Sequence, residues 1–143
     1  MPRFEKSIDI NVPPQKAFDY VSDITRHAEW SIHGLSVEKT SSGPLAVGST
    51  FKTTGHQMGT HTGVVTITEL VPNQKVVYES NDDTARVKHA FELVPQNGGT
   101  RVTKSFETVK TGVMLTIFRP MMYVVQPMSL QRDLQTIKQK LES

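Results

Sequence analysis

Cysteine is absent from this chain of 143 residues. Its absence excludes disulfide bonds, thiolate metal ligands and cysteine nucleophiles, and it suits a reducing, cytoplasmic location. The first ten residues carry charges where a signal peptide needs an apolar run, so we expect no export. The most apolar stretch, 113–128, is short for a membrane span and contains Arg119, Pro120 and Pro127, so we predict none.

Long runs of one charge are absent as well. The 16 basic and 14 acidic residues are interspersed and leave a net charge of +2. No basic stretch is interleaved with aromatic residues, so we do not expect nucleic-acid binding. The sequence also lacks a Gly-x-Ser-x-Gly motif and a Gly-rich phosphate loop. We expect no cofactor, and the length predicts a single domain over 1–143.

The residues that are present show clear periodicity. Alternation over 3–12 predicts a half-buried strand, and Pro14 suits the first turn of a helix. Ser22 or Asp23 can cap a second short helix that ends at Trp30, the only tryptophan. Six further strands are predicted between Gly34 and Val109, because each break holds the residues that form turns, with Asn97-Gly98 as the strongest hairpin signal.

The period changes after Gly112. Leu130, Leu134, Ile137 and Leu141 are spaced four, three and four residues apart, which is typical of one face of a helix. We predict one helix from about 113 to 142, bent at Pro127. The predicted fold class is α+β: a curved seven-stranded antiparallel sheet holds the long C-terminal helix on its concave face, and the two short helices close one end.

The chain resembles the START-like or Bet v 1-like superfamily, which has the helix-grip fold. More narrowly, it is similar to the polyketide cyclase/dehydrase and coenzyme-Q-binding-like group. The residues that carry the likeness are "IDINVPPQKAFDYVSD", Trp30, "GSTF" at 48–51, "TITELVPNQKVVYES" at 66–80, "GGTRVTKSF" at 98–106 and "DLQTIKQKLES" at 133–143. The resemblance implies a cavity between sheet and long helix that holds hydrophobic small molecules. Because members of the group include carriers, cyclases, dehydratases and hydrolases, the fold does not decide the function.

His89 is the leading candidate for chemistry. It alternates with Val87 and Phe91, so it is predicted to point inward, where it could act as an acid/base or bind a ligand. The more common outcome is a core histidine that a neighbour satisfies. Lys104 lies between Val102 and Phe106 and shares their parity. An inward lysine needs a partner, and the more common outcome is a lysine that reaches the rim or a bulge that shifts the register.

The other histidines are weaker candidates. His56 and His61 flank a turn and could face each other as metal ligands, but no third ligand is apparent, so we predict no metal site. His27 and His33 bracket Trp30, and we predict that both lie on the surface.

Two predictions concern the helices. Four of the six methionines fall between 113 and 128, where the long helix is apolar nearly all round. That extra apolar surface must meet an end plug, a ligand or a second protomer in a homodimer. The indole of Trp30 has an apolar body and one N–H, which suits a half-exposed position at the cavity mouth; a fixed plug is the alternative.

Together these patterns predict a domain that binds a hydrophobic or amphipathic small molecule. The alternative is a cyclase, dehydratase or hydrolase that acts on a polyketide-like or aromatic compound with His89 as the acid/base. A third, weaker interpretation is a protein-interaction module that uses the apolar helix face. The predicted ligand-binding residues are Trp30, His89, Phe91, Lys104, Phe106, Phe118, Met121, Met122 and Val125.

Overall fold

The computed structural model describes residues 3–31, 36–55, 61–82, 85–111 and 119–143. For residues 61, 110, 111, 119–124 and 126, only the backbone is described.

The strands form one seven-stranded antiparallel sheet in the order β1-β7-β6-β5-β4-β3-β2. The bounds are β1 Arg3–Ile10, β2 Ser36–Lys39, β3 Thr50–Gly55, β4 His61–Val71, β5 Lys75–Asp82, β6 Ala85–Gln96 and β7 Gly99–Thr111. Neighbours in the chain are neighbours in the sheet, except that β1 pairs with β7. The predicted strands and their antiparallel pairing are therefore confirmed.

Two of the turns have the backbone that their residues predict. At the β6–β7 hairpin, Asn97 has φ 49° and Gly98 has φ 82°. Two-residue hairpins of the mirror-image type need positive φ at both positions, which Asn and Gly tolerate best. Asn73, between β4 and β5, also has a positive φ of 63°. These turns fix the register that brings the site residues together.

The helices follow the predicted order. Helix α1 covers Pro14–Ser22, a 3₁₀ turn covers Ile24–Arg26, and helix α2 covers His27–Trp30. The carboxylate of Asp23 accepts a hydrogen bond of 3.2 Å from the backbone N–H of Thr25, which is the expected cap. Helix α4 covers Arg119–Glu142 and includes Pro127, and the part of the predicted helix before 119 lies outside the described residues.

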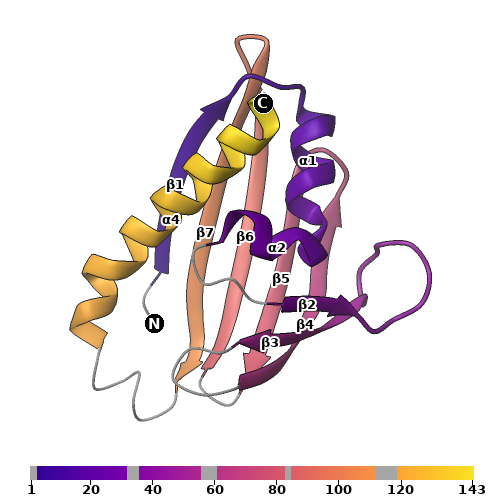
Figure 1. Ribbon diagram of the computed structural model, residues 1–143, viewed down its shortest axis with the longest axis vertical. Coiled ribbons are helices and arrows are strands. Elements are labelled where there is room, and N and C mark those ends of the chain that lie inside the picture. Colours follow the sequence, from indigo (N-terminus) through magenta and orange to yellow (C-terminus); the bar gives the residue numbers. More distant parts are fainter. Residues whose placement is uncertain (1–2, 32–35, 56–60, 83–84, 112–118) are drawn as a thin grey trace.

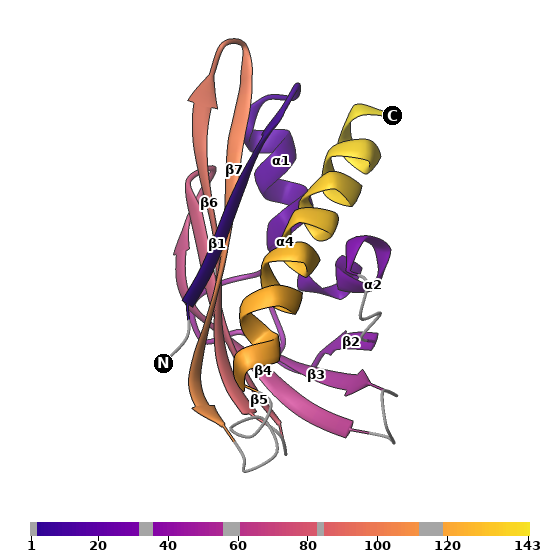
Figure 2. The same cartoon turned by 90° about the vertical axis from the view of Figure 1, so that its left-hand side faces the viewer.

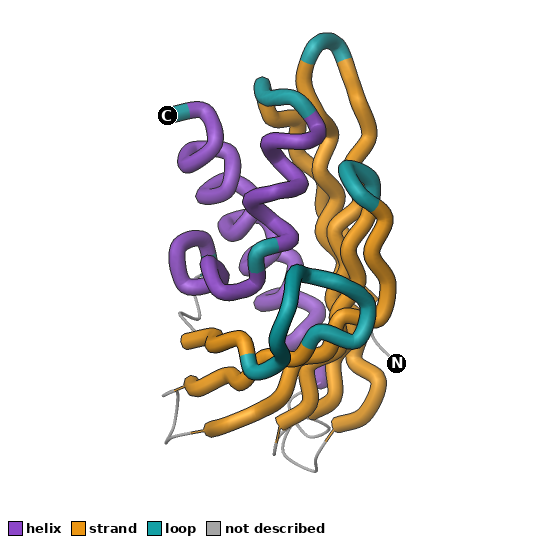
Figure 3. Tube along the Cα trace, turned by 90° about the vertical axis from the view of Figure 1, so that its right-hand side faces the viewer, coloured by secondary structure: helices purple, strands orange, loops and turns teal. Residues whose placement is uncertain are grey.

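The helices lie together on one face of the sheet (Figure 1). Figure 2 shows α4 crossing that face beside β1, with α1 and α2 next to it and β2 and β3 curving beneath α2. The tube view from the other side shows the same two layers (Figure 3). The main core forms between these layers, where Leu134, Ile137 and Leu141 of α4 pack with inward residues of the sheet. No helix in the described part of the chain is both long enough and apolar enough to cross a bilayer.

Candidate functional site

The register of β5, β6 and β7 arranges their inward side chains in rows across the sheet. Lys104 pairs with Phe91, and Phe91 pairs with Val76. In the next row, Phe106 pairs with His89, and His89 pairs with Tyr78. In the third row, Thr108 pairs with Val87, and Val87 pairs with Ser80. Because paired residues share a face, the polar side chains of Lys104, His89, Thr108 and Ser80 and the rings of Phe91, Phe106 and Tyr78 gather in the middle of the interior.

Lys104 points inward and is paired with an acid. Its Nζ atom donates a hydrogen bond of 3.3 Å to Oδ2 of Asp133, which lies on α4. The side chains of Lys104 and Asp133 are 5 % and 4 % exposed, so the ion pair is buried. The alternatives that the sequence favoured, a lysine at the rim or a shifted register, are wrong. An inward lysine was expected to need a nearby partner, and Asp133 is that partner.

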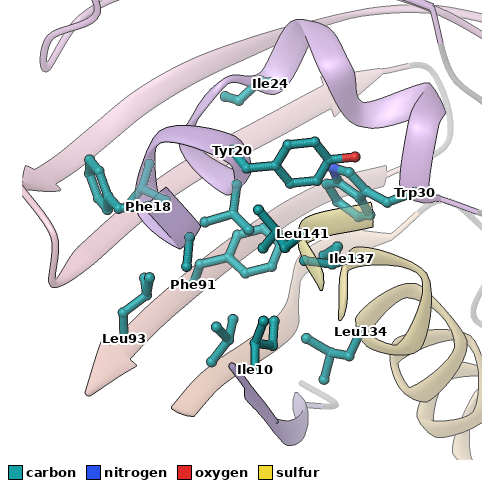
Figure 4. Packing of buried hydrophobic residues seen from close by; sticks show 14 of the residues in the cluster. Ile10, Phe18, Tyr20, Ile24, Trp30, Phe91, Leu93, Leu134, Ile137 and Leu141 are labelled. Atoms are coloured by element: carbon teal, nitrogen blue, oxygen red, sulfur yellow. The ribbon is translucent and has the colours of Figure 1, made fainter. Parts of the chain in front are cut away.

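Aromatic rings surround this ion pair. The Nζ atom of Lys104 lies 4.9 Å from the centre of the Trp30 ring and 5.8 Å from that of Phe91. Trp30 and Phe91 meet edge to face, with ring centres 5.6 Å apart and planes at 88°. A cation over aromatic faces is attracted by their negative charge density, which partly replaces the water that Lys104 has lost. Figure 4 shows Trp30 and Phe91 packed with Ile137 and Leu141.

Two predictions about α2 are wrong. The Trp30 side chain is buried at 3 % exposure, not half-exposed at a rim. His27, predicted to lie on the surface, is also buried, and its ring lies 4.6 Å from that of Trp30. The physical reason is that four-residue α2 packs between α4, β2 and the 3₁₀ turn, so that His27 and Trp30 face inward while Ala28 and Glu29 face the solvent. The burial of Trp30 agrees with the plug alternative, and the absence of movement on ligand entry stays a prediction.

His89 is half-buried, and its ring is held on three sides. It stacks on Tyr78 at a centre distance of 4.9 Å and meets the edge of Phe106 at 5.3 Å. Its Nε2 atom shares a hydrogen bond of 3.2 Å with the hydroxyl of Ser80. One ring nitrogen is therefore satisfied by a neighbour, as expected of a core histidine.

The interior shifts the protonation of these groups. Burial lowers the pKa of His89 well below its usual range, and the charges of Lys104 and His27 lower it further. Burial also lowers the pKa of Lys104, an effect that Asp133 opposes. The pKa of Tyr78 is raised by burial and by the charge of Asp133. At neutral pH the imidazole of His89 and the phenol of Tyr78 are therefore uncharged.

Some buried polar atoms have no hydrogen-bond partner among the described residues. They include Nδ1 of His89, Oγ1 of Thr108 and Nε1 of Trp30. Buried polar groups are normally paired, so each of these atoms raises the question of what it binds. Two of them, on His89 and Thr108, belong to the inward rows of the sheet.

Of the remaining residues predicted to bind a ligand, some lie on the inward face, one is exposed, and the others lie outside the described residues or have only their backbone described. Phe91 is fully buried and Phe106 half-buried on the inward face. Val125 is 43 % exposed on α4, which corrects its predicted place in the lining. Phe118 lies outside the described residues, as do the side chains of Met121 and Met122.

The predicted histidine pair is not described, because His56 and the side chain of His61 lie outside the described residues. Within the described part of the chain, no three His, Cys, Asp or Glu side chains gather as metal ligands would.

Two of the depressions on the described surface are large enough to consider as binding sites. The larger, of about 520 Å³, is lined by Thr40, Phe51, Lys52, Thr62, Gly63, Val64, Asn81 and Asp82. The smaller, of about 220 Å³, is lined by Asp19, Ser22, Asp23, Thr25, Lys39, Leu45 and Phe51. Neither contains a predicted site residue. The cavity expected between sheet and helix stays a prediction, since residues 112–118 lie outside the description.

Sequence reasoning missed several residues of this cluster. Asp133 lies three residues after Leu130 and four before Ile137, so an acid on the apolar helix face was a usable signal. Thr108 continues the parity of Lys104 and Phe106 and could have been found in the same way. Tyr78 and Ser80 depend on the pairing of β5 with β6, which alternation within one strand does not determine.

A family model described as "Polyketide cyclase / dehydrase and lipid transport" matches residues 1–142. The chain belongs to that family. This agrees with the resemblance to the START-like and Bet v 1-like superfamily and with the helix-grip fold. A search of curated proteins finds no match.

Solved structures share the fold. TTHA0849 from Thermus thermophilus is 14 % identical over 99 % of this chain and 97 % of its own, with a TM-score of 0.78. The di-domain ARO/CYC StfQ from the steffimycin biosynthetic pathway is 16 % identical over 98 % of this chain and 50 % of its own, with a TM-score of 0.77. Ara h 8.0201 is 17 % identical over 99 % of this chain and 97 % of its own, with a TM-score of 0.68. At such identities the likeness shows the fold alone.

Proposed function

We propose that this protein binds one hydrophobic or amphipathic small molecule between the sheet and α4, with the polar part of the molecule directed at Lys104 and His89. Membership of a family described by cyclase, dehydrase and lipid-transport functions supports this proposal. The observation that carries it is the buried Lys104–Asp133 pair, with neutral His89 nearby, inside a largely apolar core.

The energetics of the Lys104–Asp133 pair favour a role in binding. A buried ion pair gains little stability, because the cost of removing two charges from water offsets their attraction. Well-packed apolar side chains at both positions would stabilise the fold as well or better. A few fixed polar groups in an apolar interior are, in contrast, what orients a small ligand. The pair is therefore better explained by binding than by stability.

Native mass spectrometry of freshly purified protein tests the proposal. We expect one small molecule per chain, released on denaturation. Lys104→Met/Asp133→Leu, which replaces the ion pair by apolar groups, should fold but lose the molecule. The Lys52→Met variant is the matched control, since exposed Lys52 lies outside the interior, and it should keep the molecule. The proposal fails if the wild type carries nothing and takes up no 2-naphthol.

One observation favours the enzyme alternative. A general base must be neutral and have a free nitrogen, and His89 has a lowered pKa and an Nδ1 atom that no described residue binds. If the enzyme is a dehydratase, His89→Gln should still bind but should accumulate the hydrated precursor, which differs from the wild-type product by one water. Recovery of the same molecule from both proteins would favour a carrier.

A further inference from the structure

Burial of the Thr108 hydroxyl costs folding free energy, and the fold alone does not explain why the chain bears that cost. Thr108 is 1 % exposed, and its Oγ1 atom has no hydrogen-bond partner among the described residues. Leaving a buried hydroxyl unpaired destabilises a protein, whereas a valine of the same shape would avoid the cost. Thr100, on the same strand and equally buried, donates a hydrogen bond of 2.8 Å to the backbone oxygen of Val12. The two threonines thus differ in whether the protein itself satisfies them.

A second unpaired atom lies beside Thr108. His89 pairs with Phe106, and Thr108 is two residues further along the same strand, so the two side chains are diagonal neighbours on the inward face. Such neighbours have Cα atoms about 7 Å apart, within reach of one ligand group. The Nε2 atom of His89 is engaged by Ser80, which leaves Nδ1 as the second atom without a described partner. The two atoms form a polar spot between Val87 and Phe106.

The charges around this spot are already balanced. Lys104 and Asp133 neutralise each other at 3.3 Å. The other titratable groups that face His89 are Tyr78 and His27, and a charged ligand group would meet no described counter-ion that is not already paired. Burying an uncompensated charge costs far more than burying a hydroxyl or a carbonyl.

We propose that Thr108 joins His89 and Lys104 around the polar end of the ligand, and that this end is an uncharged hydroxyl or carbonyl group, not a carboxylate or an amine. The inference rests on the proposed function and specifies the ligand class. The Thr108 hydroxyl can donate or accept. Because the Ser80 hydroxyl can also donate or accept at Nε2, the Nδ1 atom of His89 can take either role. A phenol or a ketone satisfies both residues.

Binding titrations with 2-naphthol, 2-methylnaphthalene and 2-naphthoate test the inference. The three probes share one ring system and end in a hydroxyl, a methyl and a carboxylate. In Thr108→Val, the ratio of 2-naphthol affinity to 2-methylnaphthalene affinity should fall about three- to tenfold, the value of one hydrogen bond. In the matched Thr100→Val variant the ratio should stay at the wild-type value. The melting temperature should rise in Thr108→Val and fall in Thr100→Val, since only Thr100 loses a bond.

The outcomes separate the two claims. If the wild type binds both neutral probes but the ratio is the same in Thr108→Val, the subsite is wrong and the proposed function stands. Tighter binding of 2-naphthoate than of 2-naphthol also overturns the inference. If the wild type binds neither neutral probe, the proposed function fails and the inference fails with it.

Discussion

At the scale of single residues, the site depends on which way a few polar side chains point. Alternation along one strand correctly predicted that His89 faces inward and raised the same option for Lys104. It could not predict Asp133 as the partner, because helical periodicity does not say how a helix is aligned along a sheet. The burial of His27 and Trp30 was missed for a related reason: four residues of α2 are too few to show a period.

The Lys104–Asp133 pair leads to the first prediction. Asp133→Asn removes the partner and leaves a buried cation, so the free energy of unfolding should fall by about 3–5 kcal/mol. Lys104→Met/Asp133→Leu removes both charges and should recover most of that loss. Urea unfolding measures both changes. If the double variant is no more stable than Asp133→Asn, the pair contributes to stability in a way that contradicts the binding argument.

His89 leads to a prediction about pH. Its pKa is lowered in the folded state, while in the unfolded state it lies near the usual value of about 6.5. Below that pH the unfolded chain binds a proton that the folded chain does not. The stability that depends on neutral His89 is therefore complete above about pH 6.5 and is lost as the pH falls below that value. Compared with His89→Gln, the wild type should lose up to about 1.4 kcal/mol more per pH unit below that value. Urea unfolding between pH 8 and about pH 5 measures the difference, and parallel curves for the two proteins would contradict it.

At the scale of elements, turn chemistry and alternation were enough to predict the sheet. Asn97 and Gly98 have the positive φ angles that a two-residue hairpin needs, and this turn sets the β6–β7 register that aligns His89 with Phe106. The long helix was predicted from its apolar stripe, and α4 over Arg119–Glu142 agrees with it where the chain is described. The α4 stripe did not reveal that Val125 faces solvent, because that part of the helix is apolar nearly all round.

Gly98 and Gly99 give a prediction at this scale. A Cβ atom on Gly99 would collide with the backbone of Ile10 and Asn11, where β1 ends against β7. A Cβ atom on Gly98 meets nothing within 4 Å, and only its φ of 82° is unfavourable. Gly98→Ala should therefore lower the free energy of unfolding by about 1–2 kcal/mol. Gly99→Ala should cost more, because backbone atoms cannot move aside as a flexible side chain can. Equal unfolding free energies for the two variants would show that the β1 end yields easily.

At the scale of the whole molecule, the order of elements predicted the helix-grip fold and the family, and both are confirmed. The function is less determined, since one fold serves carriers and enzymes alike. In its interior, an ion pair, a neutral histidine and a threonine whose hydroxyl has no described partner lie among aromatic rings. We propose that these groups serve a ligand held between the sheet and α4.

The most direct test locates the binding site of a ligand. Nitrogen-15 NMR spectra recorded while 2-naphthol is added show which residues the ligand contacts. Trp30 is the only tryptophan, so its indole N–H gives one signal from the interior. We predict that this signal and the backbone amides of His89, Lys104 and Thr108 shift together. The amides of Lys52 and Asn81, in the larger surface depression, should stay in place. Shifts confined to Lys52 and Asn81, with the interior signals unmoved, would contradict the account.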